Sequence, residues 1–210
     1  MVVDTMSYDE VEAELLKAWV EVAERIVRKM EYNKSKYRRQ VIKSKKPRLG
    51  TIKFNTTRGI TFSVIPICKN RKSIDKMRCT VYTTFMYKEH TLIALIGTGN
   101  MFLIFTKHAF FRFFERARGI CNVEFNEENV DDFMYSNNVL YGEDYRTPKG
   151  RDCIMCATEC GAFLCIKISS EVVIANTFID NSLVREGKQK ELVDFCQMTR
   201  LMMHNMRLSA

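Results

Sequence analysis

Residues 79–97 read CTVYTTFMYKEHTLIALIG, and this stretch decides the fold class of the chain. Both sides of a short polar segment are rich in residues that favour strands, β-branched and aromatic before it and β-branched and aliphatic after it. The polar segment, 87–91, predicts a hairpin turn between strands at 79–87 and 91–97. Two strands joined by so short a turn pair antiparallel, so an antiparallel sheet is expected.

Further strands are predicted on both sides of this hairpin. The segment 137–150 is rich in polar residues and glycine, and it is expected to be a loop. The additional strands are expected at 51–55, 59–67 and 101–105, and in a second group at 151–158, 162–169 and 171–179.

Helices are predicted around these strands. The clearest covers 8–30, where apolar residues recur every three or four positions and Ser7 with Glu10 forms a capping-box signature. Others are expected at about 106–117 with Gly119 as the stop, at 127–135 after Asn126, and at 186–207. The predicted class is α+β: a curved antiparallel β-sheet with flanking helices and a long N-terminal amphipathic helix. The expected domains are 1–50, the N-terminal helix and basic tract, and 51–210, the α+β domain.

The positive charge is concentrated in one segment. The chain carries 33 Lys+Arg against 25 Asp+Glu, a net charge of +8, and residues 33–48 contain eight of the basic residues and no acid. Without that tract, 25 basic residues balance the 25 acidic ones. The tract, with Tyr37 interleaved, is either a phosphate-binding segment for nucleic acid or a solvated linker. Its basic residues are Lys34, Lys36, Arg38, Arg39, Lys43, Lys45, Lys46 and Arg48.

Composition and motifs exclude several classes of protein. No apolar stretch reaches the roughly 20 residues that span a bilayer, and the first residues do not resemble a signal peptide. We therefore expect a cytoplasmic protein without a membrane partner, in which the eight cysteines are reduced thiols. The motifs of ATP-driven, dinucleotide-dependent, zincin and serine-hydrolase enzymes are absent, and no cofactor is expected.

Four cysteines lie close together in sequence, at positions 153, 156, 160 and 165. Their spacing does not match the paired clusters of structural zinc sites, so no metal is expected and the thiols are predicted to lie in the core. A redox role requires Cys156 and Cys160 to be close and exposed.

The segment 105–120, FTKHAFFRFFERARGI, carries the candidate chemistry. At about 100° per residue, one helical sector about 100° wide holds His108, Arg112, Glu115 and Arg116. Phe110, Phe113, Phe114 and Ala117 fall on the opposite side. An imidazole can move a proton near neutral pH, and two guanidiniums can grip a phosphate and stabilise its developing charge. The alternative is a solvated face with intrahelical pairs such as Arg112 with Glu115.

The pattern His-Ala-x-x-Arg-x-x-Glu-Arg, followed by Gly-Ile, a short helix and antiparallel strands, resembles the RelE-like toxins of the barnase–EndoU–colicin–RelE ribonuclease group. The resemblance covers about 105–180, and residues 1–100 have no counterpart in those compact toxins. It implies a helix bearing His and Arg beside a curved antiparallel sheet. It also implies a hydroxyl or aromatic residue on a late strand, for which Thr177 is the counterpart in this chain.

The resemblance implies a metal-independent endoribonuclease in which the RNA 2′-OH attacks the adjacent phosphorus. His108 or Glu115 would take the proton, Arg112 and Arg116 would hold the phosphate, and Thr177 would position the phosphate or the 2′-OH. RNA is the expected partner, and an antitoxin or another protein partner is possible. The alternative is a non-catalytic α+β binding module for nucleic acid or a protein, built on the helix of Trp19 and the basic tract. A shared concave pocket for His108, Arg112, Arg116 and Thr177 would favour the enzyme.

Overall fold

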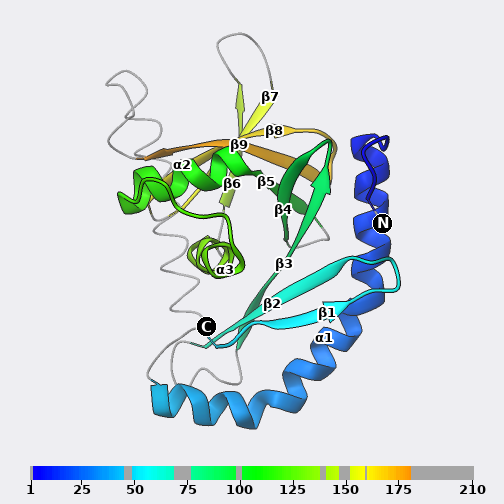
Figure 1. The fold of residues 1–210 in the computed structure, drawn as a ribbon, viewed down its shortest axis with the longest axis vertical. Helices are drawn as coiled ribbons and strands as arrows, with labels where there is room; N and C mark the ends of the chain where they lie inside the picture. The colour runs from blue at the N-terminus through cyan, green and yellow to red at the C-terminus, as the bar shows by residue number, and fades with distance from the viewer. Residues whose placement is uncertain are drawn as a thin grey trace. The chain divides into compact units, whose positions relative to one another are not determined.

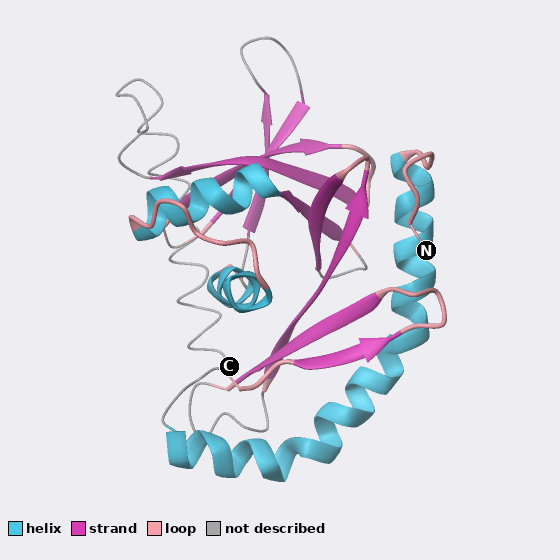
Figure 2. Cartoon of the chain, viewed as in Figure 1, coloured by secondary structure: helices cyan, strands magenta, loops and turns pink. Residues whose placement is uncertain are grey.

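The structure, a computed structural model, has the α+β class that the sequence predicts (Figures 1 and 2). The chain divides into two compact units, Met1–Phe102 and Leu103–Ala210, and the segment boundary predicted near residue 50 lies inside the first of them. No helix among the described residues is long and apolar enough to cross a membrane. The described residues are 2–44, 49–68, 77–97, 101–137, 141–146, 152–158 and 160–180, so the helix predicted at 186–207 lies outside them.

The first unit contains an antiparallel meander whose strands neighbour one another in chain order. The predicted central hairpin is confirmed: only Lys88 and Glu89 separate its strands, with φ angles of 47° and 63°. Such positive φ values at both central residues suit the twist of a tight hairpin. The strands are β1 (Ile52–Asn55), β2 (Thr61–Ile67), β3 (Arg78–Tyr87) and β4 (His90–Ile96).

Helix α1 (Tyr8–Ser44) begins as predicted and continues much further. The capping box is confirmed, because the Glu10 carboxylate accepts from the Ser7 N–H at 2.7 Å and the Ser7 hydroxyl accepts from the Glu10 N–H at 3.3 Å. The predicted end at residue 30 is wrong, since the buried stripe continues through Tyr37 and Val41. The start of the basic tract is therefore helical, and burial of its apolar residues supports the extra turns.

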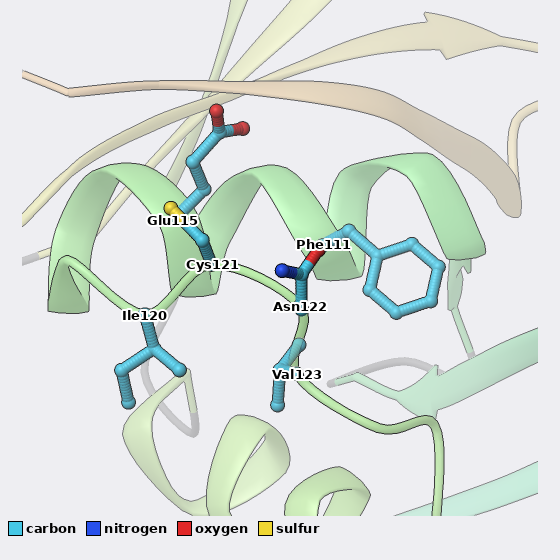
Figure 3. A pocket seen from close by; sticks show the side chains of 6 residues that line it. All are labelled: Phe111, Glu115, Ile120, Cys121, Asn122 and Val123. Atoms are coloured by element: carbon cyan, nitrogen blue, oxygen red, sulfur yellow. The ribbon is translucent and has the colours of Figure 1, made fainter.

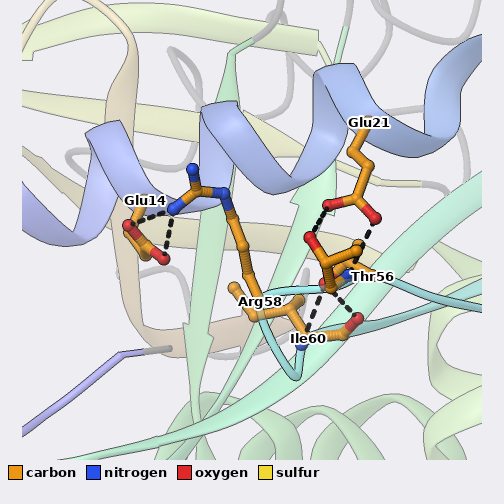
Figure 4. A network of polar contacts seen from close by, with 6 residues as sticks. Glu14, Glu21, Thr56, Arg58 and Ile60 are labelled. Carbon is orange, nitrogen blue, oxygen red and sulfur yellow. Dashed lines mark hydrogen bonds and ion pairs between the residues drawn. The ribbon is translucent and has the colours of Figure 1, made fainter.

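Polar contacts join α1 to the loop between β1 and β2 (Figure 4). The Glu21 carboxylate accepts from the Thr57 N–H at 2.7 Å and from the Thr57 hydroxyl at 2.9 Å. The Arg58 guanidinium lies 3.1 Å from the Glu14 carboxylate. Beneath these contacts the Trp19 ring packs edge-on against Phe62 of β2, with 5.9 Å between the ring centroids. Helix α1 is thus joined to the loop by polar and charged contacts and to β2 by an apolar contact.

The second unit combines two short helices with a five-stranded sheet in the order β5-β9-β8-β7-β6. Strand β6 corrects the prediction of a loop at 137–150. Its residues have weak strand propensity, but it pairs antiparallel along its whole length with β7, which supplies the missing stability. The elements are β5 (Phe102–Thr106), α2 (Lys107–Arg118), α3 (Glu127–Ser136), β6 (Tyr141–Arg146), β7 (Asp152–Ala157), β8 (Gly161–Lys167) and β9 (Val172–Asp180).

A cluster of phenylalanines forms the core of the second unit. The Phe133 ring of α3 lies 5.0 Å from Phe105 of β5 and 5.2 Å from Phe113 of α2, measured between centroids. Phe163 and Phe178, from β8 and β9, lie 4.9 Å apart and complete the cluster from the sheet. Edge-to-face contacts of this kind stabilise a core beyond the apolar area that they bury. Helix α2 is therefore held rigidly over the sheet.

Candidate nucleic-acid interface

Helix α2 begins where a threonine at the end of β5 caps it. The Thr106 hydroxyl accepts from the Ala109 N–H at 3.2 Å, and it lies 3.3 Å from the Ala175 carbonyl oxygen of β9, to which it can donate. The helix ends at Gly119, whose φ of 66° is the left-handed conformation that favours glycine. The predicted start and stop are confirmed, and the cap also ties the helix to β9.

The phenylalanines on the apolar side of α2 are buried as predicted, while Ala117 is half-buried. Phe110, Phe113 and Phe114 are at most 5% exposed and pack into the phenylalanine cluster. The ring of Phe113 lies 5.3 Å from that of Phe178 on β9. Because this face is fixed, the sector with the polar residues points away from the core.

The predicted sector keeps its four polar residues outside the core. His108 and Glu115 are exposed, and Arg112 and Arg116 are half-buried. Arg112 donates through Nη1 to the Glu115 carboxylate at 2.6 Å, which is the intrahelical pair expected for a solvated face. Both side chains are more than a third exposed, so the pair adds little stability. The remaining guanidinium donors of Arg112 are not used by Glu115.

Arg116 has a structural contact that the sequence does not indicate. Its guanidinium donates through Nη1 to the carbonyl oxygen of Phe178 in β9. The next basic residue, Arg118, donates to the Ser136 hydroxyl of α3 at 2.8 Å. The last turn of α2 therefore uses its cations to fasten the helix to neighbouring elements, in a position where positive charge also suits the helix dipole.

Thr177 does not join this sector. It lies on β9 opposite Leu164, and the adjacent Phe178 lies opposite Phe163. Phe163 and Phe178 both point into the phenylalanine cluster beneath α2. Neighbouring strand residues point to opposite faces, which places the Thr177 side chain on the face of the sheet away from α2. The predicted grouping of Thr177 with the helix residues is corrected by this alternation.

A shallow hollow lies beside the polar sector (Figure 3). It has a volume of about 520 Å³ and includes Glu115, but not the other three residues of the sector or Thr177. Asn122, with a φ of 61°, helps turn the chain back along the helix. The side chains lining the hollow are Phe111, Glu115, Ile120, Cys121, Asn122 and Val123.

Phe111 is the residue of this surface that sequence reasoning missed. It is 38% exposed, and its ring lies 6.5 Å from that of Phe125. The Lys107 ammonium lies 5.0 Å from the Phe125 centroid, so one cation packs beside this pair of rings. The helical spacing could have identified Phe111, because it falls about 40° from Glu115 around α2 and far from the buried Phe113.

Only half of the cysteine cluster lies in the core, so the prediction of four core thiols is corrected for the other half. Cys156 and Cys165 are buried, Cys153 is half-buried and Cys160 is exposed. A hydrogen bond with the Cys156 thiol, together with burial, raises the pKa of the Cys165 thiol. Burial of Cys156 leaves the condition for a redox pair with Cys160 unmet, and the described residues contain no group of three potential metal ligands.

The basic tract is split between different environments. Lys36, Arg38 and Arg39 are exposed on α1, and Lys34 lies 3.5 Å from the Glu31 carboxylate. Tyr37 is only 4% exposed, so it is a core residue of α1 and cannot stack on a base. The side chain of Lys43 and residues Lys45, Lys46 and Arg48 lie outside the described part of the chain.

The chain was compared with models of protein families, with curated proteins and with solved structures, and none of them matches. The resemblance to RelE-like toxins therefore stays a prediction that rests on the residues of 105–180.

Proposed function

We propose that this protein binds RNA through the polar sector of α2. The observation that carries the proposal is the placement of Arg112 beside His108 on the solvent side of a helix whose other side is fixed by phenylalanines. Helix α2 contains four basic residues and one acid, so its outer surface attracts a polyanion. The cation–aromatic surface formed by Lys107, Phe111 and Phe125 lies on the same helix and its following loop, and such surfaces suit single-stranded nucleic acid.

Arg112 is the residue proposed to contact phosphate. Glu115 engages one nitrogen of its guanidinium and holds the side chain in place, and the free donors can form a two-pronged contact with a phosphate. Arg116 and Arg118 have protein acceptors, so they are assigned to holding α2 in place and not to contacting RNA.

RNA binding is tested with a fluorescently labelled single-stranded RNA of mixed sequence, titrated at several salt concentrations. Arg112→Gln should weaken binding and lower the slope of log affinity against log salt by about 0.7. Arg118→Gln is the matched control, because it removes the same charge from the same helix at a position bonded to Ser136. Equal slopes for the two variants and the wild type would remove α2 from the binding surface.

A metal-independent endoribonuclease is the second candidate function. The observation that favours it is the exposure of the His108 imidazole one helical turn from Arg112. The RNA 2′-OH would attack the adjacent phosphorus, and the proton would pass to His108 because the Glu115 carboxylate is occupied by Arg112. The bond from phosphorus to the 5′-oxygen of the next nucleotide would break, and this oxygen would take a proton from water, giving a 2′,3′-cyclic phosphate and a free 5′-hydroxyl. Arg112 would stabilise the charge that develops on the phosphate oxygens.

Cleavage is tested by incubating the purified protein with total RNA in EDTA. The enzyme hypothesis expects cleavage that His108→Ala abolishes. His90→Ala is the control, since His90 is the exposed first residue of β4 in the other unit. Binding without cleavage by the wild type supports the non-catalytic module.

A further inference from the structure

The outward side of α1 carries an exposed tyrosine among cations. At about 100° per residue, Lys29, Lys36 and Arg39 all lie within about 60° of Tyr32 around the helix. Tyr32 is 83% exposed, the largest exposure among the large apolar and aromatic side chains of the described residues. The Lys29 ammonium lies 5.8 Å from the centroid of the Tyr32 ring. These four residues, Lys29, Tyr32, Lys36 and Arg39, are called the outer stripe.

The cations of the outer stripe are not neutralised by neighbouring acids. Glu31 is the only acid in 29–44, and it lies about 100° away from Tyr32 around the helix, 3.5 Å from Lys34. Within the described residues, no carboxylate forms an ion pair with Lys29, Lys36 or Arg39. By contrast, Arg28 on the same side of the helix is paired with Glu24.

We propose that the outer stripe is a second binding site, which takes single-stranded nucleic acid. Its cations would contact successive phosphates along about 15 Å of helix, the rise from Lys29 to Arg39. A base would stack on the face of Tyr32 that Lys29 leaves open, and stacking of this kind tolerates any base sequence. The proposal assigns to α1 a binding role of its own, which does not depend on the chemistry of α2.

Nucleic acid suits this stripe better than a lipid surface does. A helix that lies in a membrane interface inserts an apolar face opposite its cations. The apolar face of α1 is already buried, from Val11 through Val41, and it packs on β1 and β2. What remains outside is a narrow row of cations with one aromatic ring, which matches a phosphate backbone with adjacent bases.

The test uses the full chain and a labelled oligo(U) RNA of about 20 nucleotides, followed by fluorescence anisotropy at several salt concentrations. Lys36→Gln/Arg39→Gln should lower the slope of log affinity against log salt by about 1.4, or about 0.7 for each lost phosphate contact. Lys34→Gln/Arg38→Gln is the matched control, because it removes the same charge from the same turns on other faces of the helix. Its slope should stay close to that of the wild type.

Two substitutions of Tyr32 distinguish base stacking from attraction between charges. Tyr32→Ala should weaken binding by about fivefold or more at constant salt, and Tyr32→Phe, which keeps the ring, should bind like the wild type. Far-ultraviolet circular dichroism of each variant verifies that α1 remains helical, so that a loss of binding reports the side chain.

Three results would overturn the proposal. Equal slope losses in the two double variants would mean that the face of the helix does not matter. Unchanged binding in the stripe variants, together with a loss in Arg112→Gln, would reject the stripe and leave the proposal for α2 standing. Tighter binding to phosphatidylserine vesicles than to RNA, lost in the stripe variants, would assign the stripe to a membrane surface. A loss in the stripe variants with unchanged Arg112→Gln supports the stripe and rejects α2.

Discussion

Helices α1 and α2 are both amphipathic, but they use their charged residues differently. In the first half of α1, Glu14 and Glu21 bind the loop between β1 and β2, so their charges are part of the internal structure of the first unit. In α2, Arg116 and Arg118 have such structural contacts, while His108 and the outer donors of Arg112 face solvent. The charged residues of an amphipathic helix can therefore either hold the fold together or face solvent. The contact that each side chain makes decides which of the two it does.

The largest loss of stability is expected from a substitution in the buried face of α2. Phe113→Ala should lower the free energy of unfolding by about 3–5 kcal/mol, because it removes a ring from the centre of the phenylalanine cluster. Urea denaturation measures the change. Phe111→Ala is the control on the same helix, and its 38% exposed ring should cost far less. Equal losses would mean that Phe111 is also a core residue.

The next largest losses of stability are expected at the two helix caps, and the two losses should differ in size. Thr106→Ala should cost about 1–2 kcal/mol, because it removes both the cap of α2 and the contact of its hydroxyl with β9. Ser7→Ala removes only the cap of α1 and should cost about 1 kcal/mol or less. Thermal unfolding of both variants tests the difference. A larger loss from Ser7→Ala would show that the start of α1 matters more than the link between α2 and β9.

The contact between Glu21 and the loop that joins β1 to β2 should make the stability of the protein depend on pH. Hydrogen bonds from the Thr57 N–H and hydroxyl hold the pKa of the Glu21 carboxyl below its usual value. A carboxyl with a lowered folded pKa contributes stability above its unfolded pKa, near 4.3, and loses that contribution as the pH falls through the folded value. The melting temperatures of the wild type and Glu21→Gln should therefore converge between about pH 5 and pH 3.

Glu24→Gln is the control for this measurement, since Glu24 is an exposed residue of α1 whose ion pair is with Arg28, four positions further along the same helix. A difference between wild type and Glu21→Gln that stays constant across this pH range would show that the charge of Glu21 is not what binds the loop.

The smallest effects on stability are expected at the polar sector of α2. His108→Ala and Arg112→Lys should each change the free energy of unfolding by less than about 0.5 kcal/mol, because both side chains lie outside the core. Arg112→Lys should nevertheless weaken RNA binding, since lysine keeps the charge but loses the planar two-pronged donor. A large drop in melting temperature for either variant would identify a structural role and remove the main support for the proposed function.

The sequence predicted correctly those features that depend on residues close together in the chain. The hairpin around Lys88 and Glu89, the capping box at Ser7, and the start and stop of α2 at Thr106 and Gly119 were all identified from neighbouring residues. Each depends on interactions within a few positions along the chain. The end of α1 was missed because the basic residues masked an apolar spacing that continues through Tyr37 and Val41.

The sequence by itself determined which residues of α2 face outward, since the 3.6-residue period separates His108 and Arg112 from the phenylalanines. Tertiary structure decided what those residues contact. The pairing of β8 with β9 turned Thr177 away from the helix, and the approach of β9 gave Arg116 a carbonyl partner. Strand β6 likewise exists because β7 is available to pair with it. Such contacts join residues far apart in the chain, and no local pattern encodes which of them meet.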